Sequence, residues 1–209
     1  MCIRDRSIVI AAGSTYRRLD IPGEDDLIGS GVHFCATCDG AFYRDKEVLV
    51  IGGGNSALEE GIFLAGFCAK VTIISRKPDF SASKTYIDKL PSIKNIETRM
   101  NQTSVEFTAD ERGLFRSLTI QDNDSKETEV LSADGVFVFV GLIPNTDFLK
   151  GFVELDERNF IKTECGTVQT SVEGVLAAGD CRMGAVAQVA AATGEGVMAS
   201  YAVRRFLSN

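Results

Sequence analysis

A short apolar segment that runs into a glycine triplet constrains the fold more than any other feature of the sequence. Residues 47–51 read Glu-Val-Leu-Val-Ile, and residues 52–54 are all glycine. From residue 55 to about residue 67 apolar side chains recur at helical spacing, and residues 71–74 form a second β-rich apolar run. Strand, glycine turn, helix and strand in this order predict a βαβ unit with parallel strands. We therefore expect an α/β protein with a Rossmann-like dinucleotide-binding domain.

The glycine turn has the spacing of a dinucleotide-binding fingerprint, with Gly52, Gly54 and Ala57 at its three positions. The first glycine permits the tight turn, the second lets the backbone approach a pyrophosphate, and the small third residue lets helix and strand pack closely. The pyrophosphate would then meet free N–H groups at the positive end of the helix dipole. A structural turn without a ligand is the alternative, but a position between strand and helix favours nucleotide binding.

The end of the second strand indicates which nucleotide binds. An NAD site usually carries Asp or Glu there, whereas cationic side chains accommodate the 2′-phosphate of NADPH. Here the strand is followed by Ser75, Arg76 and Lys77, and the next carboxylate is Asp79. The positive charge favours NADPH. NADH or another donor is one alternative, and a solvated basic turn is the other.

The remaining segments predict a β-meander and part of a second domain. Short alternating runs between about residues 104 and 131 suit antiparallel strands, and the apolar run at 136–141 suits a strand buried on both faces. Further strands are expected at 7–12 and 174–178, a mostly loop stretch at 14–31, and a long helix at about 187–207. The expected domains are a remnant strand at 1–14, the nucleotide-binding domain at 15–143, and the C-terminal part of another domain at 144–209.

The composition is that of an ordinary globular protein of 209 residues, 44% hydrophobic and 24% charged, which can bury a substantial core. The formal net charge of −7 argues against nucleic-acid and anionic-membrane partners, because their phosphates repel an acidic protein. No apolar run approaches the length that spans a bilayer, and the first six residues lack the apolar core of a signal peptide. We expect a cytoplasmic protein with reduced thiols.

Two of the six cysteines, Cys35 and Cys38, lie close together, and Asp39 follows them directly. A zinc site would need four N or S ligands, but the chain has a single histidine, His33, and no second close cysteine pair, so we expect no metal site. Two inert buried thiols would leave Asp39 unexplained. Redox chemistry, in contrast, needs a thiolate, a second sulfur nearby and a proton source, which Asp39 can supply.

The order of these motifs resembles that of the low-molecular-weight thioredoxin reductases. Cys-Ala-Thr-Cys-Asp-Gly at 35–40 precedes a strand and Gly-Gly-Gly-Asn-Ser-Ala at 52–57, and residues 174–180 match the family's flavin-binding segment. The resemblance, which extends from residue 7 onward, implies NADPH and FAD as cofactors and a second Rossmann-like domain for the FAD. The implied cofactor-binding residues are Gly52, Gly54, Asn55, Ser56, Ala57, Glu59, Glu60, Arg76, Lys77, Gly141, Gly179, Asp180, Gln188 and Val189.

The resemblance also implies where some of these residues act. Asp180 would hydrogen-bond the ribityl chain of FAD, and Gln188 and Val189 would lie near the isoalloxazine ring. Glu59 or Glu60 would lie near the nicotinamide. The cationic pair that follows the second strand would hold the 2′-phosphate.

The implied reaction passes electrons from NADPH through FAD to the disulfide of Cys35 and Cys38, with Cys38 facing the flavin. Cys35 would then attack the disulfide of a thioredoxin-like dithiol protein, with Asp39 as general acid. A hinge at the domain crossings, near residues 13–14 and 141–145, would alternate two orientations of the domains. The resemblance implies a homodimer for the full-length form.

The sequence also departs from the family. It lacks the first glycine-rich βαβ unit that holds the FAD diphosphate, and residues 1–6 have no counterpart, so we expect an N-terminally truncated chain with a foreign start. The strands at 7–12 and 174–178 and one face of the last helix would then lack packing partners and should expose apolar surface. Ser75, Lys77 and Ser81 replace basic residues of the family, which weakens the preference for NADPH. A flavoprotein component of alkyl hydroperoxide reductase and a nucleotide-binding fragment without turnover are the alternatives.

Overall fold

A computed structural model describes residues 6–208, which form two compact units. Arg17–Gly141 forms the first, which we call the central unit. The segments up to Tyr16 and from Leu142 onward form the second, which we call the flanking unit. The sequence predicts boundaries after residues 14 and 143, whereas the observed boundaries lie after residues 16 and 141. The sequence predicts a foreign start at residues 1–6. Residues 1–5 of this segment lie outside the described residues.

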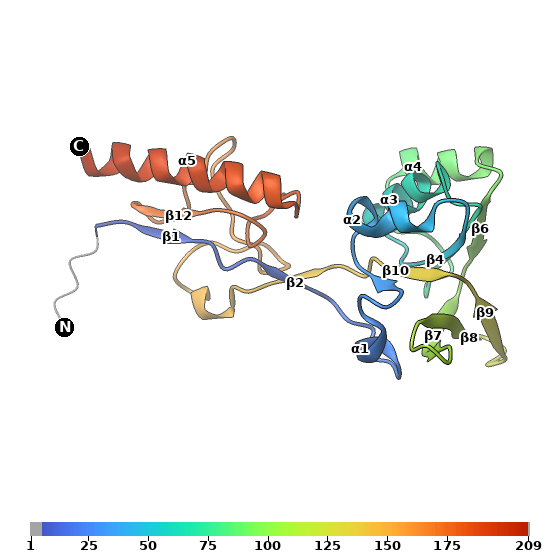
Figure 1. Cartoon of the computed structure of the whole chain (residues 1–209). Helices are drawn as coiled ribbons and strands as arrows, with labels where there is room; N and C mark the ends of the chain where they lie inside the picture. The colour runs from blue at the N-terminus through green and yellow to red at the C-terminus, as the bar shows by residue number, and fades with distance from the viewer. Residues whose placement is uncertain (1–5, 209) are drawn as a thin grey trace. The chain divides into compact units, whose positions relative to one another are not determined.

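The central unit is built on a five-stranded sheet in which every pair of neighbours is parallel (Figure 1). The expected βαβ unit is confirmed, since the glycine turn joins β4 to helix α3 (Asn55–Ala65), and α3 leads back to β5. The strand order across the sheet is β3 (Val32–His33), β10 (Gly135–Val138), β4 (Glu47–Ile51), β5 (Lys70–Ile74) and β6 (Ile96–Arg99).

Successive residues of the central strands point into two different layers. Val48 and Val50 of β4 pack in one apolar cluster with α3, whereas Leu49 and Ile51 pack in another with a β-meander. Residues 136–138 of β10 are at most 1% exposed, so a strand buried on both faces is confirmed there, but it ends at Val138 and not at residue 141. The expected meander is confirmed as the antiparallel strands β7 (Gln102–Ala109), β8 (Phe115–Asp122) and β9 (Thr128–Ser132).

The flanking unit has far less sheet. In it β1 (Ile8–Ile10) pairs in parallel with β12 (Val175–Ala177), and β2 (Ser14–Tyr16) pairs antiparallel with β11 (Leu142–Pro144). The long helix α5 (Val189–Ser208) packs against β12 (Figure 1). Exposed apolar surface is confirmed for β1 and α5, but the expectation was wrong for β12, which is buried between two apolar clusters. The exposed side chains are Ile8, Val9, Val189, Val197, Met198 and Tyr201.

Three local differences from the sequence-based expectations have physical causes. Helix α5 begins at Val189 and not near residue 187, because Ala187 has a left-handed φ of 56°, which an α-helix does not allow. Edge strand β6 was missed because its sequence, Ile-Glu-Thr-Arg, is largely polar. The stretch at 14–31, expected as mostly loop, contains β2 and α1. The remaining helices are α1 (Glu24–Leu27), α2 (Ala36–Asp39), η1 (Gly40–Tyr43), α4 (Lys84–Lys89), η2 (Leu90–Ser92) and η3 (Asp147–Leu149).

Candidate functional site

The cysteine pair lies at the start of the short helix α2 in the central unit. Cys35 and Cys38 form a disulfide, and their Cα atoms are 5.3 Å apart. Cys35 is the N-cap of α2, and its Sγ accepts a hydrogen bond of 3.1 Å from the backbone N–H of Cys38. Such a donor stabilises a thiolate at this sulfur once the disulfide is reduced. The residue Cys38 is exposed and Cys35 is half-buried, so a partner can approach the pair.

Asp39 belongs to a hydrogen-bonded chain of three side chains. Its Oδ2 lies 3.2 Å from Nδ1 of His33, and Nε2 of His33 lies 2.7 Å from the hydroxyl of Tyr43. Burial lowers the pKa of His33, although Asp39 acts in the opposite direction. Sequence reasoning considered His33 only as a zinc ligand and did not single out Tyr43. The structure therefore adds two polar residues to the cysteine centre.

The glycine turn between β4 and α3 is closed by tight packing. Gly52 has a φ of 148°, and a Cβ there would come within 2.4 Å of the carbonyl oxygen of Phe139 and 2.8 Å of the Cβ of Ala57. A Cβ at Gly53 would meet Oγ of Ser75 at 2.6 Å. At Gly54, the N-cap of α3, the nearest atom to such a Cβ is 4.0 Å away. The open side of the turn is thus at Gly54, where the fingerprint requires room for a pyrophosphate.

The cations expected at the 2′-phosphate follow β5 directly. Arg76 and Lys77 are exposed, and neither forms an ion pair with any other residue in the described part of the chain. Their backbone is held in place, because Oγ of Ser75 accepts from the N–H of Lys77 at 3.3 Å and the side chain of Asn123 donates to the carbonyl of Arg76 at 2.8 Å. The turn therefore presents two cations on a fixed backbone.

Helix α3 carries the other expected nucleotide residues. Oδ1 of Asn55 accepts from the N–H of Ser83 at 2.6 Å, which ties the first turn of α3 to the segment before α4. Glu59 is exposed, and burial together with Glu59 raises the pKa of Tyr86. Burial, together with the charge of Glu59, raises the pKa of Glu60, and its Oε2 is buried without a hydrogen-bond partner. An orphaned buried carboxylate oxygen of this kind fits a ligand group that would satisfy it.

Two further residues that the resemblance assigns to cofactor binding are exposed. Ser56 lies in the first turn of α3. Gly141, with a φ of 110°, is the last residue of the central unit.

The residues expected at the flavin lie in the flanking unit, after β12. Gly179 is buried with a φ of 77°, and its N–H donates to Oε2 of Glu195 at 2.6 Å. Asp180 is half-buried, and burial and the charge of Glu195 raise its pKa. Gln188 is half-buried, and Val189, the first residue of α5, is 84% exposed.

An ion pair that sequence reasoning missed supports this segment. Nε of Arg182 lies 2.8 Å from Oε2 of Glu195, and both side chains are 15% exposed. No local sequence pattern marks the pair, because its members are separated by a loop and the start of a helix. Asp180 suits a hydroxyl ligand such as a ribityl chain, but the described residues of the flanking unit contain no second glycine-rich strand–turn–helix that would hold a diphosphate.

The sequence pattern of the family described as pyridine nucleotide-disulphide oxidoreductase matches residues 3–196. The chain belongs to this family. Its disulfide, its glycine turn and its flavin-side segment all lie within the matched residues.

Individual members of the pyridine nucleotide-disulphide oxidoreductases are similar to this chain over nearly its whole length. Thioredoxin reductase of Bacillus subtilis is 36% identical over 202 residues, which are 97% of this chain and 63% of that protein. The solved structure of thioredoxin reductase from Giardia duodenalis matches this chain with a TM-score of 0.90 at 36% identity. The match covers 97% of this chain and 66% of that protein. An alkyl hydroperoxide reductase protein of Escherichia coli is 38% identical over 98% of this chain and 39% of that protein. The chain thus spans less than two thirds of these relatives.

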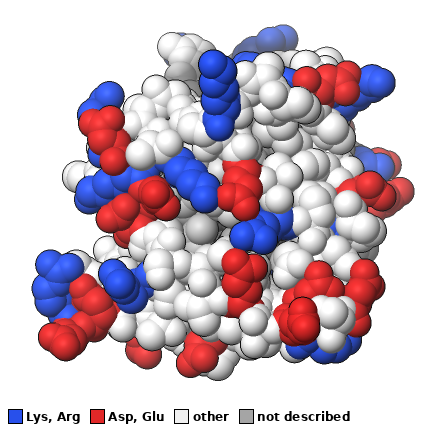
Figure 2. Space-filling view, turned by 90° about the vertical axis from the view of Figure 1, so that its right-hand side faces the viewer, with Lys and Arg blue, Asp and Glu red and all other residues white. Residues whose placement is uncertain are grey.

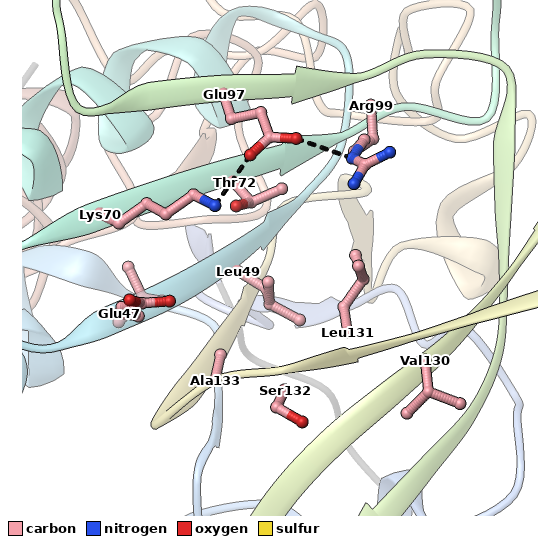
Figure 3. Close-up of a pocket in the computed structure, with 11 residues that line it drawn as sticks. Glu47, Leu49, Lys70, Thr72, Glu97, Arg99, Val130, Leu131, Ser132 and Ala133 are labelled. Carbon is pink, nitrogen blue, oxygen red and sulfur yellow. Dashed lines mark ion pairs between the residues drawn. The ribbon is translucent and has the colours of Figure 1, made fainter.

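A pocket of the central unit lies away from the family's reactive groups. It is lined by the first residues of β4 and β5, by β6 and by β9, whereas the fingerprint follows the last residues of β4 (Figure 3). In its wall Glu97 lies between Lys70 and Arg99, at 2.8 Å and 2.9 Å, and these contacts lower its pKa. Because the two carboxylates of the lining, Glu47 and Glu97, balance its two cations, Lys70 and Arg99, and parallel sheets bind ligands at their carboxyl ends, we assign no ligand to this pocket.

The surface and the helices add little to the assignment. Figure 2 shows a face on which cationic and anionic side chains are interspersed, which offers no continuous cationic track to a nucleic acid there. Within residues 6–208, no helix is both long and apolar enough to cross a membrane. The same residues contain no group of three or more His, Cys, Asp or Glu that could hold a metal ion.

Proposed function

We propose that this chain carries the NADPH site, the reactive disulfide and the C-terminal part of the FAD site of a thioredoxin reductase. The observation that supports this most is the disulfide of Cys35 and Cys38, which lies in the same unit as the glycine turn and directly before Asp39. A dithiol needs an electron source, and a dinucleotide cradle in the same unit of the fold supplies one.

Each part of the central unit has a role in this proposal. The glycine turn binds the pyrophosphate of NADPH, and the exposed Arg76 and Lys77 bind its 2′-phosphate. Lys77 provides a point charge and not a bidentate fork, so NADH is a second donor to be tested. Glu60 approaches the nicotinamide, where its unpartnered Oε2 finds a hydrogen bond.

The flanking unit holds the flavin end of the relay. Asp180 would hold the ribityl chain of FAD, and Gln188 and Val189 would border its ring. A flavin bound there would supply the electron transfer that connects NADPH with the disulfide. Electrons would enter the pair through Cys38. The thiolate of Cys35 attacks the disulfide of a thioredoxin-like protein, and Asp39 donates a proton to the sulfur that leaves.

The remaining assignments complete the proposal. The net charge of −7 supports a protein partner in preference to a nucleic acid or a membrane surface. We place the protein in the cytoplasm, where a dithiol relay works in a reducing environment. The full-length form is a homodimer, with a hinge at the two crossings between the units.

The test is NADPH consumption by the purified chain with added FAD and oxidised thioredoxin. Consumption that requires the thioredoxin and is lost in Cys35→Ser supports the proposal. NADPH binding without consumption would favour the fragment without turnover. Reduction of a peroxide-reducing partner protein in preference to thioredoxin would favour the alkyl hydroperoxide reductase function, which the similarity to the Escherichia coli protein keeps as the second candidate.

The nucleotide site has its own test, which does not depend on flavin. Gly54→Ala should fold normally, since its Cβ has open space, and should lose most NADPH affinity because the methyl group stands where the pyrophosphate approaches. Gly194→Ala, in the exposed part of α5, is the matched control, and its affinity for NADPH should be unchanged. Equal NADPH affinity of Gly54→Ala and the unaltered chain, measured by calorimetry, would remove the glycine turn from the proposal.

A further inference from the structure

The single histidine of the chain is enclosed beside the cysteine helix. His33 ends β3, and its side chain is only 10% exposed. Its ring stacks on Phe137 at 5.3 Å between centroids and meets Tyr43 edge to face at 5.4 Å. A buried polar ring costs free energy unless its nitrogens are hydrogen-bonded. Both nitrogens have partners here, Asp39 on one side and Tyr43 on the other.

The surroundings fix which atoms carry protons. Burial lowers the pKa of His33 despite Asp39, so the ring carries one proton near neutral pH. Burial, with the charges of Asp39 and Asp134, raises the pKa of Tyr43 to about 12, so the hydroxyl keeps its proton; Lys46 Nζ also faces this ring, 5.5 Å from its centroid. A carboxyl oxygen accepts at Nδ1 and the protonated hydroxyl of Tyr43 donates at Nε2, so the single ring proton is on Nδ1, which donates to Asp39.

Packing holds this arrangement in place. The ring of Tyr43 lies against Gly135, where a Cβ would come within 2.3 Å of it. The same ring meets Phe137 edge to face at 5.5 Å. Gly40, next to Asp39, lies so close to α3 that a Cβ there would be 2.9 Å from Leu64. The imidazole thus has one fixed neighbour at each nitrogen, and its direction toward Asp39 is set by the core.

We propose that His33 is a positioning residue for thiol–disulfide exchange: its Nδ1–H holds one oxygen of Asp39, so that the other delivers a proton to the departing sulfur. The inference rests on the proposed function, in which the reduced cysteines attack a disulfide. In the first step the Cys35 thiol passes its proton to the free oxygen of Asp39 and its sulfur bonds to one sulfur of the acceptor. The attacked disulfide breaks, and Asp39 passes this proton on to the sulfur that leaves. In the second step Cys38 displaces the other thiol, so that the dithiol is oxidised to a disulfide and the acceptor is reduced to two thiols.

The chemistry of the leaving group separates positioning from a structural role. An alkyl thiolate leaves poorly without a proton, whereas an aromatic thiolate of low pKa leaves well without one. The probes are therefore glutathione disulfide and 5,5′-dithiobis(2-nitrobenzoate), each mixed with the dithiothreitol-reduced, desalted chain. The exposed Cys165 and the additional Cys2 are replaced by Ser so that the cysteine pair accounts for the reaction. Flavin is not needed.

We expect His33→Phe, which keeps a ring against Phe137, to slow the reaction with glutathione disulfide by on the order of tenfold, since a positioned acid contributes roughly 10²–10⁴-fold in all. The reaction with the aromatic disulfide should change by less than about twofold. His33→Asn, which keeps a donor toward Asp39, should recover part of the rate. In an Asp39→Asn background, His33→Phe should have no further effect, because both variants remove the same proton delivery.

Other outcomes would overturn the inference or the proposed function separately. Equal slowing with both disulfides, or additive effects of His33→Phe and Asp39→Asn, would make His33 a structural residue only. If His33→Phe does not fold, Tyr43→Phe takes its place, and no slowing with glutathione disulfide in that variant would overturn the positioning role. If the unaltered reduced chain reacts with neither disulfide, the proposed function itself fails.

Discussion

The two units of this chain bury their apolar side chains to different degrees. In the central unit five parallel strands are covered on one face by α3 and on the other by a meander, and the strand β10 is almost completely buried. In the flanking unit a two-stranded sheet carries a helix of 20 residues, and Val9 and Tyr201 remain 44% and 64% exposed. The central unit therefore encloses its own apolar core around the reactive groups, whereas the flanking unit leaves apolar surface in water.

The same contrast appears in the chemistry. The disulfide, the Asp39–His33–Tyr43 chain and the glycine turn are all within the central unit. The flanking unit holds Asp180 and the Arg182–Glu195 pair. We infer that dithiol chemistry and nucleotide binding depend on the central unit. Flavin binding depends in addition on whether the exposed apolar surface of the flanking unit is buried.

The largest expected effect compares one residue type in the two units. Phe137 is fully buried between the layers of the central unit, and Phe148 of the flanking unit is 72% exposed. Phe137→Ala should lower the free energy of unfolding by about 3–5 kcal/mol, because it leaves a cavity in a closed core. Phe148→Ala should change it by less than about 0.5 kcal/mol. Urea unfolding followed by circular dichroism measures both, and similar losses would break the comparison.

A second prediction concerns self-association through the flanking unit. Val197 and Tyr201 are four residues apart on α5 and both exposed, so replacing both by Lys should weaken self-association about tenfold or more by removing apolar area from the contact. Val130→Lys alters a side chain of the central unit that is 62% exposed and is the control. Sedimentation velocity over a concentration series distinguishes them. Association that falls as much with Val130→Lys would place the contact elsewhere.

The smallest predicted effects are two pH dependences of opposite sign. The pKa of Glu60 is raised by burial and by Glu59, so its contribution to stability is full at low pH and is lost as pH rises through the folded pKa. The pKa of Glu195 is lowered by Arg182, so its contribution is present at neutral pH and is lost as pH falls through the folded pKa.

At neutral pH, Glu60→Gln should therefore stabilise the central unit and Glu195→Gln destabilise the flanking unit, each by about 1 kcal/mol or less, because glutamine keeps neutral hydrogen bonds. Both differences should shrink toward about pH 4, where the carboxyls protonate. Hydrogen exchange resolves the two units in one experiment. A change of the same sign in both variants would contradict this account of the charges.

Much of the fold could be predicted because its signals are local. The apolar run of β4, the glycine turn and the helical spacing of α3 are each contained in a few consecutive residues, and they specified the βαβ unit. Strand β6 has no such signal, since it is an edge strand of mixed polarity and is specified by pairing with β5. The start of α5 depends on the left-handed backbone at Ala187. The sequence does not indicate this conformation, because glycine and not alanine is the residue that usually adopts it.

The candidate site divides in the same way. Cys35, Cys38 and Asp39 are adjacent in sequence, so their chemistry could be inferred directly. His33 meets Tyr43 and Asp39 only because the end of β3 and the two short helices after it pack against Phe137 of a distant strand. Contacts of this kind follow from tertiary packing and leave no spacing rule in the sequence.

The most direct test of the central claim, that the central unit carries a working dithiol centre, is a single turnover without flavin. The chain is reduced with dithiothreitol, desalted and mixed with oxidised thioredoxin, and the thioredoxin dithiol is quantified. About one thioredoxin should be reduced per chain, as two-electron exchange requires, and none with Cys35→Ser. Thioredoxin that stays oxidised while the thiols of Cys35 and Cys38 are free and titratable would contradict the central claim.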